Sequence, residues 1–96
     1  MRTLNWRDRV TGGSEARASR AIGGAYRILY QPGGYKNWRD EIVEPFYEIE
    51  YRRRANREWE SVGIPTATLV AAKREAEADN DERIRWLHCD EETDAA

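Results

Sequence analysis

Cysteine and histidine are nearly absent from this chain of 96 residues, which contains one of each. Cys89 alone cannot form an intramolecular disulfide, and His88 beside it cannot complete a zinc site without carboxylates or a second chain. The sequence therefore predicts no cofactor and no structural metal. The pair also lacks a third residue to orient it, so we do not expect it to act in catalysis.

Long hydrophobic runs are missing too. No apolar segment approaches the roughly 18 residues that a membrane-spanning helix needs, and residues 1–10, MRTLNWRDRV, carry charges where a signal peptide needs apolar residues. We therefore expect a cytoplasmic protein without membrane contact. A chain this short forms one domain, predicted over residues 1–89, followed by an acidic, disordered tail over residues 90–96, DEETDAA.

Motifs for nucleotide binding or catalysis are also lacking. The glycine doublets at 12–13, 23–24 and 33–34 do not have the spacing of a phosphate-binding loop, so they indicate turns. Glu48 and Glu50 alternate with hydrophobic residues and precede a run of arginines, which suits ion pairing rather than proton donation. We therefore expect a protein that is not an enzyme.

Charge is plentiful and unevenly distributed, although the net charge is only −2. Residues 1–57 contain 12 Lys/Arg and 7 Asp/Glu, a net charge of +5, whereas residues 58–96 contain 4 and 11, a net charge of −7. Such a separation can steer a charged partner over about 8–10 Å at physiological salt. Almost all basic residues are arginine, which suits bidentate contacts with carboxylate or phosphate.

Alternation of hydrophobic and polar residues predicts several strands. Leu4, Trp6 and Val10 alternate with polar residues, residues 26–30 read YRILY, and residues 46–54 read FYEIEYRRR. Residues 15–20, EARASR, are short and polar, so we expect an edge strand there. An exposed edge would permit a homodimer as well as a monomer.

A strand-to-helix transition follows Trp59. Pro65 and Thr66 break the strand and offer a helix cap, and the apolar stripe of the helix begins at Leu69. Residues 79–82, DNDE, are expected to end this helix and to start a second helical turn that runs to about residue 88. The predicted fold is therefore α+β: an antiparallel sheet of four to five strands, one Ala-rich helix packed on it and a short C-terminal helical turn.

Two connections are candidate binding segments. Residues 31–45, QPGGYKNWRDEIVEP, form either a lid that tucks Trp38 into the core or a partner-binding surface, for which aromatic residues and arginine are preferred anchors. Residues 52–57, RRRANR, form a hairpin tip that either keeps a turn soluble or binds phosphate or an acidic protein surface.

The order of several motifs resembles that of small proteins common in phages and prophages. The motifs are Trp6, GGAYRILY at 23–30, FYEIEY at 46–51, and Trp59 followed by SVGIPTATLVAAKREAEAD at 61–79. The resembling proteins have three or four antiparallel strands and then a helix with the pattern Thr-Leu, Ala-Lys, Ala-Glu. This chain departs from them in the 31–45 connection and the basic tip. The resemblance implies a compact accessory factor of a mobile element, such as an anti-CRISPR protein.

These observations together predict a non-enzymatic phage-type factor that inhibits a host defence protein, such as a CRISPR–Cas component, by steric and electrostatic occlusion. Either an acidic face competes for a basic surface, or a basic tip and loop dock on an acidic one. The alternative is a small nucleic-acid-binding module that uses a basic sheet face and the 52–57 tip. The acidic face comprises Glu75, Glu77, Asp79, Asp81 and Glu82, and the basic tip and loop comprise Arg52, Arg53, Arg54, Arg57, Tyr35, Trp38 and Arg39.

Overall fold

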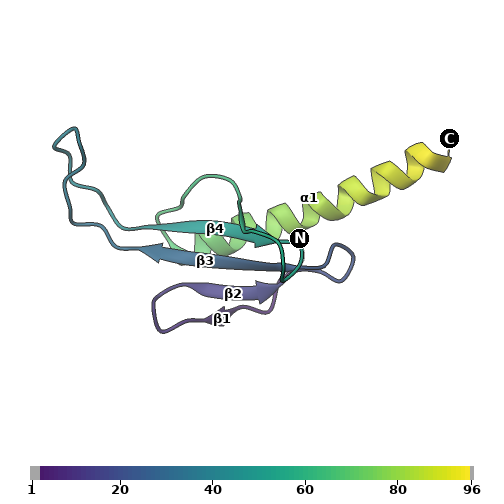
Figure 1. Cartoon of the computed structure of the whole chain (residues 1–96), viewed down its shortest axis with the longest axis horizontal. Helices are drawn as coiled ribbons and strands as arrows, with labels where there is room; N and C mark the ends of the chain where they lie inside the picture. Colours follow the sequence, from purple (N-terminus) through teal and green to yellow (C-terminus); the bar gives the residue numbers. More distant parts are fainter. Residues whose placement is uncertain (1–2, 96) are drawn as a thin grey trace.

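A five-stranded antiparallel sheet with one long helix across it makes up the fold (Figure 1). The structure, a computed structural model, describes residues 3–95, with side chains as far as residue 87. The strands lie in the order in which they occur along the chain, and the predicted α+β class is confirmed. The elements are β1 (Arg7–Asp8), β2 (Ser14–Arg17), β3 (Ala25–Gln31), β4 (Phe46–Arg52), β5 (Glu60–Ser61) and α1 (Leu69–Ala95).

The centre of the sheet is the β3–β4 pair, as the alternation predicts. Tyr26 lies opposite Tyr51 and Ile28 opposite Ile49, and all four are buried beneath α1. The two tyrosine rings pack with their centroids 4.9 Å apart. Cross-strand pairs of aromatic and β-branched residues stabilise a sheet directly, so this double pair anchors the core.

The helix begins later than the sequence suggests. Thr66 is not the cap, because its backbone N–H and C=O both pair with those of Tyr47, 3.0 and 2.8 Å away. Thr68 caps the helix instead, and its Oγ1 accepts a hydrogen bond from the N–H of Ala71. Ala72 and Ala76 are fully buried against the sheet, because their small side chains let the helix backbone approach closely.

α1 continues through residues 79–82, so the prediction of a separate C-terminal helical turn is wrong. Asp79 and Asn80 disfavour helix when their side chains bond to the nearby backbone. Here Asp79 accepts a hydrogen bond from the Tyr26 hydroxyl and Asn80 accepts one from the N–H of Ser19, so neither competes with the helix. The backbone of α1 runs to Ala95, whereas the side chains of His88, Cys89 and the predicted tail lie outside the described residues.

The mismatch in length between helix and sheet makes the molecule elongated. A helix of 27 residues is about 40 Å long, whereas a strand of 7 residues spans only about 23 Å. Figure 1 shows α1 extending past one end of the sheet while the β3–β4 connection extends past the other. The Cα radius of gyration is 15.7 Å, against about 12.5 Å for a compact domain of this length.

β2 is not an edge strand, contrary to the sequence-based expectation. It pairs with β1 on one side and β3 on the other, and its inward residues Ser14 and Ala16 are buried. Their small size hides the alternation that a buried strand normally displays. The edges are β1 and β5, which have two residues each. Pairing with β1 therefore occupies the outer edge of β2 at Ser14 and Glu15.

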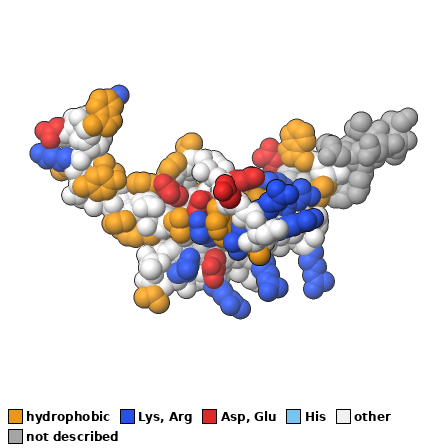
Figure 2. All heavy atoms as spheres, in the orientation of Figure 1, with side chains coloured by type: hydrophobic (Ala, Val, Ile, Leu, Met, Phe, Trp, Pro, Cys, Tyr) orange, Lys and Arg blue, Asp and Glu red, His pale blue; other side chains and the backbone are white. Residues whose placement is uncertain are grey.

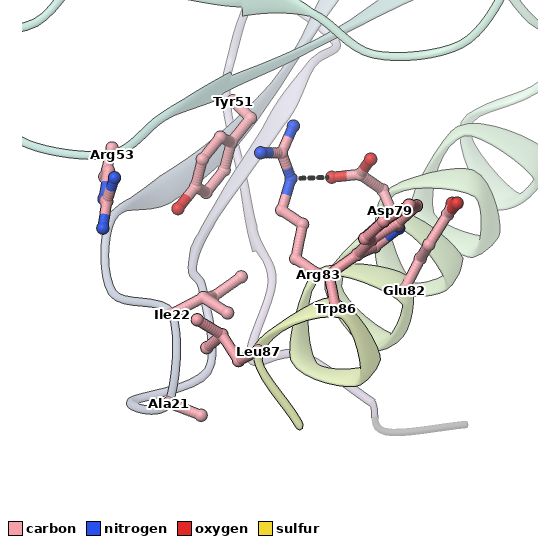
Figure 3. A pocket seen from close by; sticks show the side chains of 9 residues that line it. All are labelled: Ala21, Ile22, Tyr51, Arg53, Asp79, Glu82, Arg83, Trp86 and Leu87. Carbon is pink, nitrogen blue, oxygen red and sulfur yellow. Dashed lines mark hydrogen bonds and ion pairs between the residues drawn. The ribbon is translucent and has the colours of Figure 1, made fainter. Parts of the chain in front are cut away.

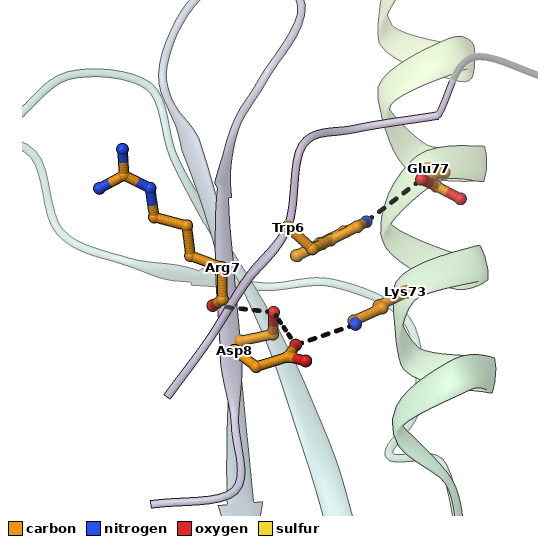
Figure 4. Close-up of polar contacts among 6 residues, drawn as sticks. Trp6, Arg7, Asp8, Lys73 and Glu77 are labelled. Atoms are coloured by element: carbon orange, nitrogen blue, oxygen red, sulfur yellow. Dashed lines mark hydrogen bonds and ion pairs between the residues drawn. The ribbon is translucent and has the colours of Figure 1, made fainter. Parts of the chain in front are cut away.

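The N-terminal segment is fastened to α1 by polar contacts rather than by a long strand (Figure 4). Glu77 Oε2 accepts hydrogen bonds from the Leu4 N–H at 2.8 Å and from Trp6 Nε1 at 3.2 Å. Lys73 pairs with Asp8 at 3.0 Å, and this hydrogen bond lowers the pKa of the Asp8 carboxyl. We call Glu77 with Leu4 and Trp6 the clasp. Val10, predicted to share their inward face, is fully exposed.

Candidate functional site

The connection between β3 and β4 is a small ordered hairpin, here called the finger (residues 32–45). The Gly34 N–H bonds to the Val43 carbonyl and the Val43 N–H to the Tyr35 carbonyl, each at 2.8 Å. Lys36 and Ile42 form a further antiparallel bridge. At the tip, the Asn37 side chain accepts hydrogen bonds from the N–H groups of residues 39 and 41. The finger is therefore held in shape by its own backbone.

Large hydrophobic side chains cover the finger but do not pack into the core. Trp38 is 86% exposed, Ile42 67% and Tyr35 55%. The expectation that Trp38 tucks into the core is wrong, because the hairpin carries it beyond the end of the sheet. The Arg39 guanidinium lies 4.5 Å from the centre of the Trp38 ring. The structure thus places Tyr35, Trp38 and Arg39 on one projecting hairpin, and Figure 2 shows hydrophobic and charged side chains side by side on this projection.

The basic tip lies at the opposite end of the β3–β4 ladder from the finger. Gln31 pairs with Phe46 beside the finger, whereas Ala25 pairs with Arg52 at the start of the tip. The tip and the finger, predicted as one docking surface, are therefore two separate surfaces. Arg53, Arg54 and Arg57 are exposed, while Arg52 is half-buried and stacks on Trp59 at 4.4 Å.

The predicted acidic face does not form as one surface. Glu77 is buried in the clasp, and Asp79 points toward the sheet, where it bonds to Tyr26 and Arg83. Glu75 and Glu82 are exposed, and Asp81 is half-buried. A helical period places Glu77 near the Ala72–Ala76 stripe, which the charge-based reading overlooked. Glu77 and Asp79 thus already have partners within the fold.

A cavity of about 450 Å³ opens between α1 and the turn that precedes β3. Figure 3 shows Ile22 and Arg53 on one side and Glu82, Trp86 and Leu87 on the helix side. The Tyr51 hydroxyl donates a hydrogen bond to the Gly23 carbonyl at 2.8 Å, which holds the turn in place. Sequence reasoning did not identify this cavity, because its walls come from segments about 60 residues apart.

Behind the cavity, a short polar chain connects the helix to the core tyrosines. The Tyr26 hydroxyl donates to Asp79 at 2.6 Å, and Asp79 also pairs with Arg83 Nε at 2.6 Å. The Arg83 guanidinium in turn lies 4.1 Å from the centre of the Tyr51 ring. Burial, and then the hydrogen bond to Asp79, raise the pKa of Tyr26 well above its usual value. Burial also raises the pKa of Tyr51.

Replacing Tyr26 by phenylalanine should flatten the alkaline limb of the stability profile. Above pH 10 the unfolded tyrosine loses its proton while the folded one keeps it, so the free energy of unfolding falls as pH rises. Each such tyrosine contributes up to about 1.4 kcal/mol per pH unit. Urea unfolding between pH 9 and 11 measures this slope. Identical slopes for Tyr26→Phe and the wild type would contradict the assignment.

Three further properties bear on function: grouped metal-binding side chains, membrane-spanning helices and similarity to known proteins. Among the described residues, no three His, Cys, Asp or Glu side chains are grouped as a metal site would require. No helix in the described part of the chain is long and apolar enough to cross a membrane. Comparisons of the chain with protein-family models, curated proteins and solved structures found no match. The finger, the basic tip and the cavity are the candidate functional sites of the described residues.

Proposed function

We propose that this protein is a non-enzymatic binding factor that docks on another protein through its finger. The observation that carries the proposal is the exposure of Trp38, 86%, on a hairpin ordered by its own hydrogen bonds. Trp, Tyr and Arg are the residues that most often dominate binding energy at protein interfaces. A rigid finger loses little conformational entropy on binding, so more of the contact energy appears as affinity.

The composition of the finger favours a protein partner over a nucleic acid. Its charged residues are two cations and three carboxylates, and Lys36 is already paired with Asp40 at 3.4 Å. A nucleic-acid contact needs an excess of positive charge. Apolar anchors rimmed by mixed charges are typical of protein interfaces. The partner is therefore expected to offer an apolar pocket for Trp38, with a carboxylate near Arg39.

A host defence protein, such as a CRISPR–Cas component, is the partner class that the sequence resemblance favours. The proposed mechanism is steric: the finger anchors the protein, and the rest of its 56 Å length covers the partner's surface. We do not propose that the acidic residues of α1 compete for a basic surface, because Glu77 and Asp79 already bond to groups within the fold. Inhibition then depends on Trp38 and its neighbours rather than on the acidic residues of α1.

The test replaces Trp38 by alanine and compares partner retention with that of Val10→Ala. Val10 is a matched control, because it is also an exposed apolar residue but lies outside the finger. Immobilised wild-type protein, Trp38→Ala and Val10→Ala are each incubated with bacterial lysate, and retained proteins are identified by mass spectrometry. Calorimetry with the purified partner should give roughly 30-fold weaker binding for Trp38→Ala, the loss of about 2 kcal/mol typical of a dominant anchor. Equal affinity for all three proteins would exclude the finger as the docking site.

A further inference from the structure

Arginines from separate parts of the sequence meet at the end of the sheet opposite the finger. The register places Arg17, the last residue of β2, and Arg52, the last residue of β4, on either side of Ala25, with both side chains on the sheet face away from α1, because Tyr26 and Tyr51 face the helix. The turn after β2 adds Arg20, and the tip after β4 adds three more. Segments 17–24 and 52–60 together hold six arginines and two glutamates. We call this set the arginine end: Arg17, Arg20, Arg52, Arg53, Arg54 and Arg57.

Backbone packing holds the two turns of the arginine end together. A Cβ atom on Gly24 would lie 2.2 Å from the Arg52 carbonyl oxygen, so the two chains are in direct contact there. The Tyr51 hydroxyl bonds to Gly23 in the same place. The arginines therefore project from a fixed base rather than from independent loops. Figure 2 shows Lys and Arg side chains gathered right of centre and along the lower margin of the molecule, with others on the finger.

The cavity between α1 and the preceding turn lies directly beside this cluster, because Arg53 belongs to both. Trp86, 64% exposed, stands on the helix side of the cavity, and Ile22 and Leu87 supply apolar contact surface. Its volume of about 450 Å³ falls in the range of small-ligand sites, roughly 300–1,000 Å³. Arg53 of the arginine end and Arg83 of α1 line the cavity together with this exposed indole, so a stacking surface and positive charge lie in one place.

We propose that the arginine end and this cavity bind single-stranded nucleic acid. One base enters the cavity and stacks on Trp86, while the arginines contact the flanking phosphates. Aromatic stacking combined with a basic surface is the usual means of binding a single strand. Glu82 lines the cavity as well and can accept a hydrogen bond from a base amino group.

The surroundings favour a single strand over a duplex. In a duplex the bases are stacked on each other and cannot reach Trp86. The exposed carboxylates of Glu75 and Glu82 on α1 would also repel a second phosphate backbone. The net charge of −2 does not oppose the proposal, because segments 17–24 and 52–60 have a local excess of four positive charges, while nine of the 18 Asp and Glu residues lie after residue 74. This surface is separate from the finger, so the proposal stands or falls independently of the protein-docking function.

Fluorescence anisotropy with a labelled 12-nucleotide RNA, a DNA strand of the same sequence and the matching DNA duplex tests the proposal. We expect micromolar binding of a single strand at about 50 mM salt. Between about 50 and 200 mM salt, three to four phosphate contacts predict a 20- to 50-fold loss of affinity. No binding of either single strand at 100 µM protein, roughly a hundred times the expected dissociation constant, would overturn the proposal.

Two variants separate stacking from charge. Trp86→Ala should weaken single-strand binding about 5- to 150-fold and leave the salt dependence unchanged, because only stacking is lost. Arg53→Gln with Arg54→Gln should lower the slope of log affinity against log salt by about 1.4, since two phosphate contacts are removed. All three side chains are exposed, so the variants should fold, as circular dichroism can verify. Trp38→Ala is the control and should bind like the wild type.

Either of two further results would overturn the proposal. Unchanged affinity in Trp86→Ala would show that no base enters the cavity. Equal affinity for the duplex and the single strands would show a general attraction to polyanions rather than recognition of an unpaired base.

Discussion

Replacing Gly24 by alanine should destabilise the protein by about 2–4 kcal/mol, the sum of backbone strain and a steric clash. Gly24 has a φ of +87°, which residues with a Cβ rarely adopt. The added Cβ would lie 2.2 Å from the Arg52 carbonyl oxygen and 2.9 Å from the Arg53 Cα. Both are backbone atoms, so the clash can be relieved only by separating the turn from the end of β4.

Gly23→Ala is the matched control for this substitution. Gly23 also has a positive φ, +70°, but a Cβ there would have no neighbouring atom within 4 Å. It should therefore cost only the strain of the backbone conformation, about 1–2 kcal/mol. Urea unfolding of both variants measures the difference. If the two adjacent substitutions cost the same, the close contact between the turn and β4 does not exist in solution.

Glu77→Ala should cost about 2–4 kcal/mol, because it removes the acceptor of two hydrogen bonds from groups that are largely out of water. The Leu4 N–H is in a buried residue, and Trp6 packs against the core. Without the carboxylate, the Leu4 N–H and the Trp6 indole N–H can bond to water only if the N-terminal segment moves away from α1. The loss of stability should therefore include the contribution that the burial of Leu4 and Trp6 makes in the wild type.

Glu77→Gln keeps a hydrogen-bond acceptor at this position but removes the negative charge. The amide oxygen can still accept from Leu4 and Trp6, so the loss should be about half that of Glu77→Ala. Amide hydrogen exchange at Leu4 should be fast in Glu77→Ala and close to wild type in Glu77→Gln. Slow exchange at Leu4 in both variants would mean that the clasp does not hold the N-terminal segment.

The central strands and the helix were predictable from the sequence because their signals are local. Alternation around Ile28 and Ile49 identifies β3 and β4, and the spacing of Ala72 and Ala76 identifies the buried stripe of α1. The clasp was not predictable in this way, since Leu4 and Glu77 are 73 residues apart. Glu77 has the sequence signature of a solvated residue, and only the path of the N-terminal segment shows that it is buried.

The candidate sites also differ in whether their residues are neighbours in the sequence or are brought together only by the fold. The finger was identified as a possible binding segment, because its aromatic residues are neighbours in sequence, although Trp38 was also considered as a core residue. Arg17 and Arg20 were overlooked, because only the pairing of β2 with β3 brings them to the same end of the sheet as Arg52. The place of Trp86 beside a cavity depends on where α1 crosses the turn that precedes β3, which the sequence does not show.

The β3–β4 ladder also sets the distance between the finger and the arginine end. Its seven residue pairs form an uninterrupted antiparallel ladder between the finger and the arginine end. Two ligands bound at these ends would be held about 23 Å or more apart at a fixed orientation. If both belong to one assembly, engagement of the first end raises the local concentration of the second ligand, and two weak contacts give a long-lived complex. Lengthening or kinking the ladder would abolish this gain while leaving each separate affinity intact.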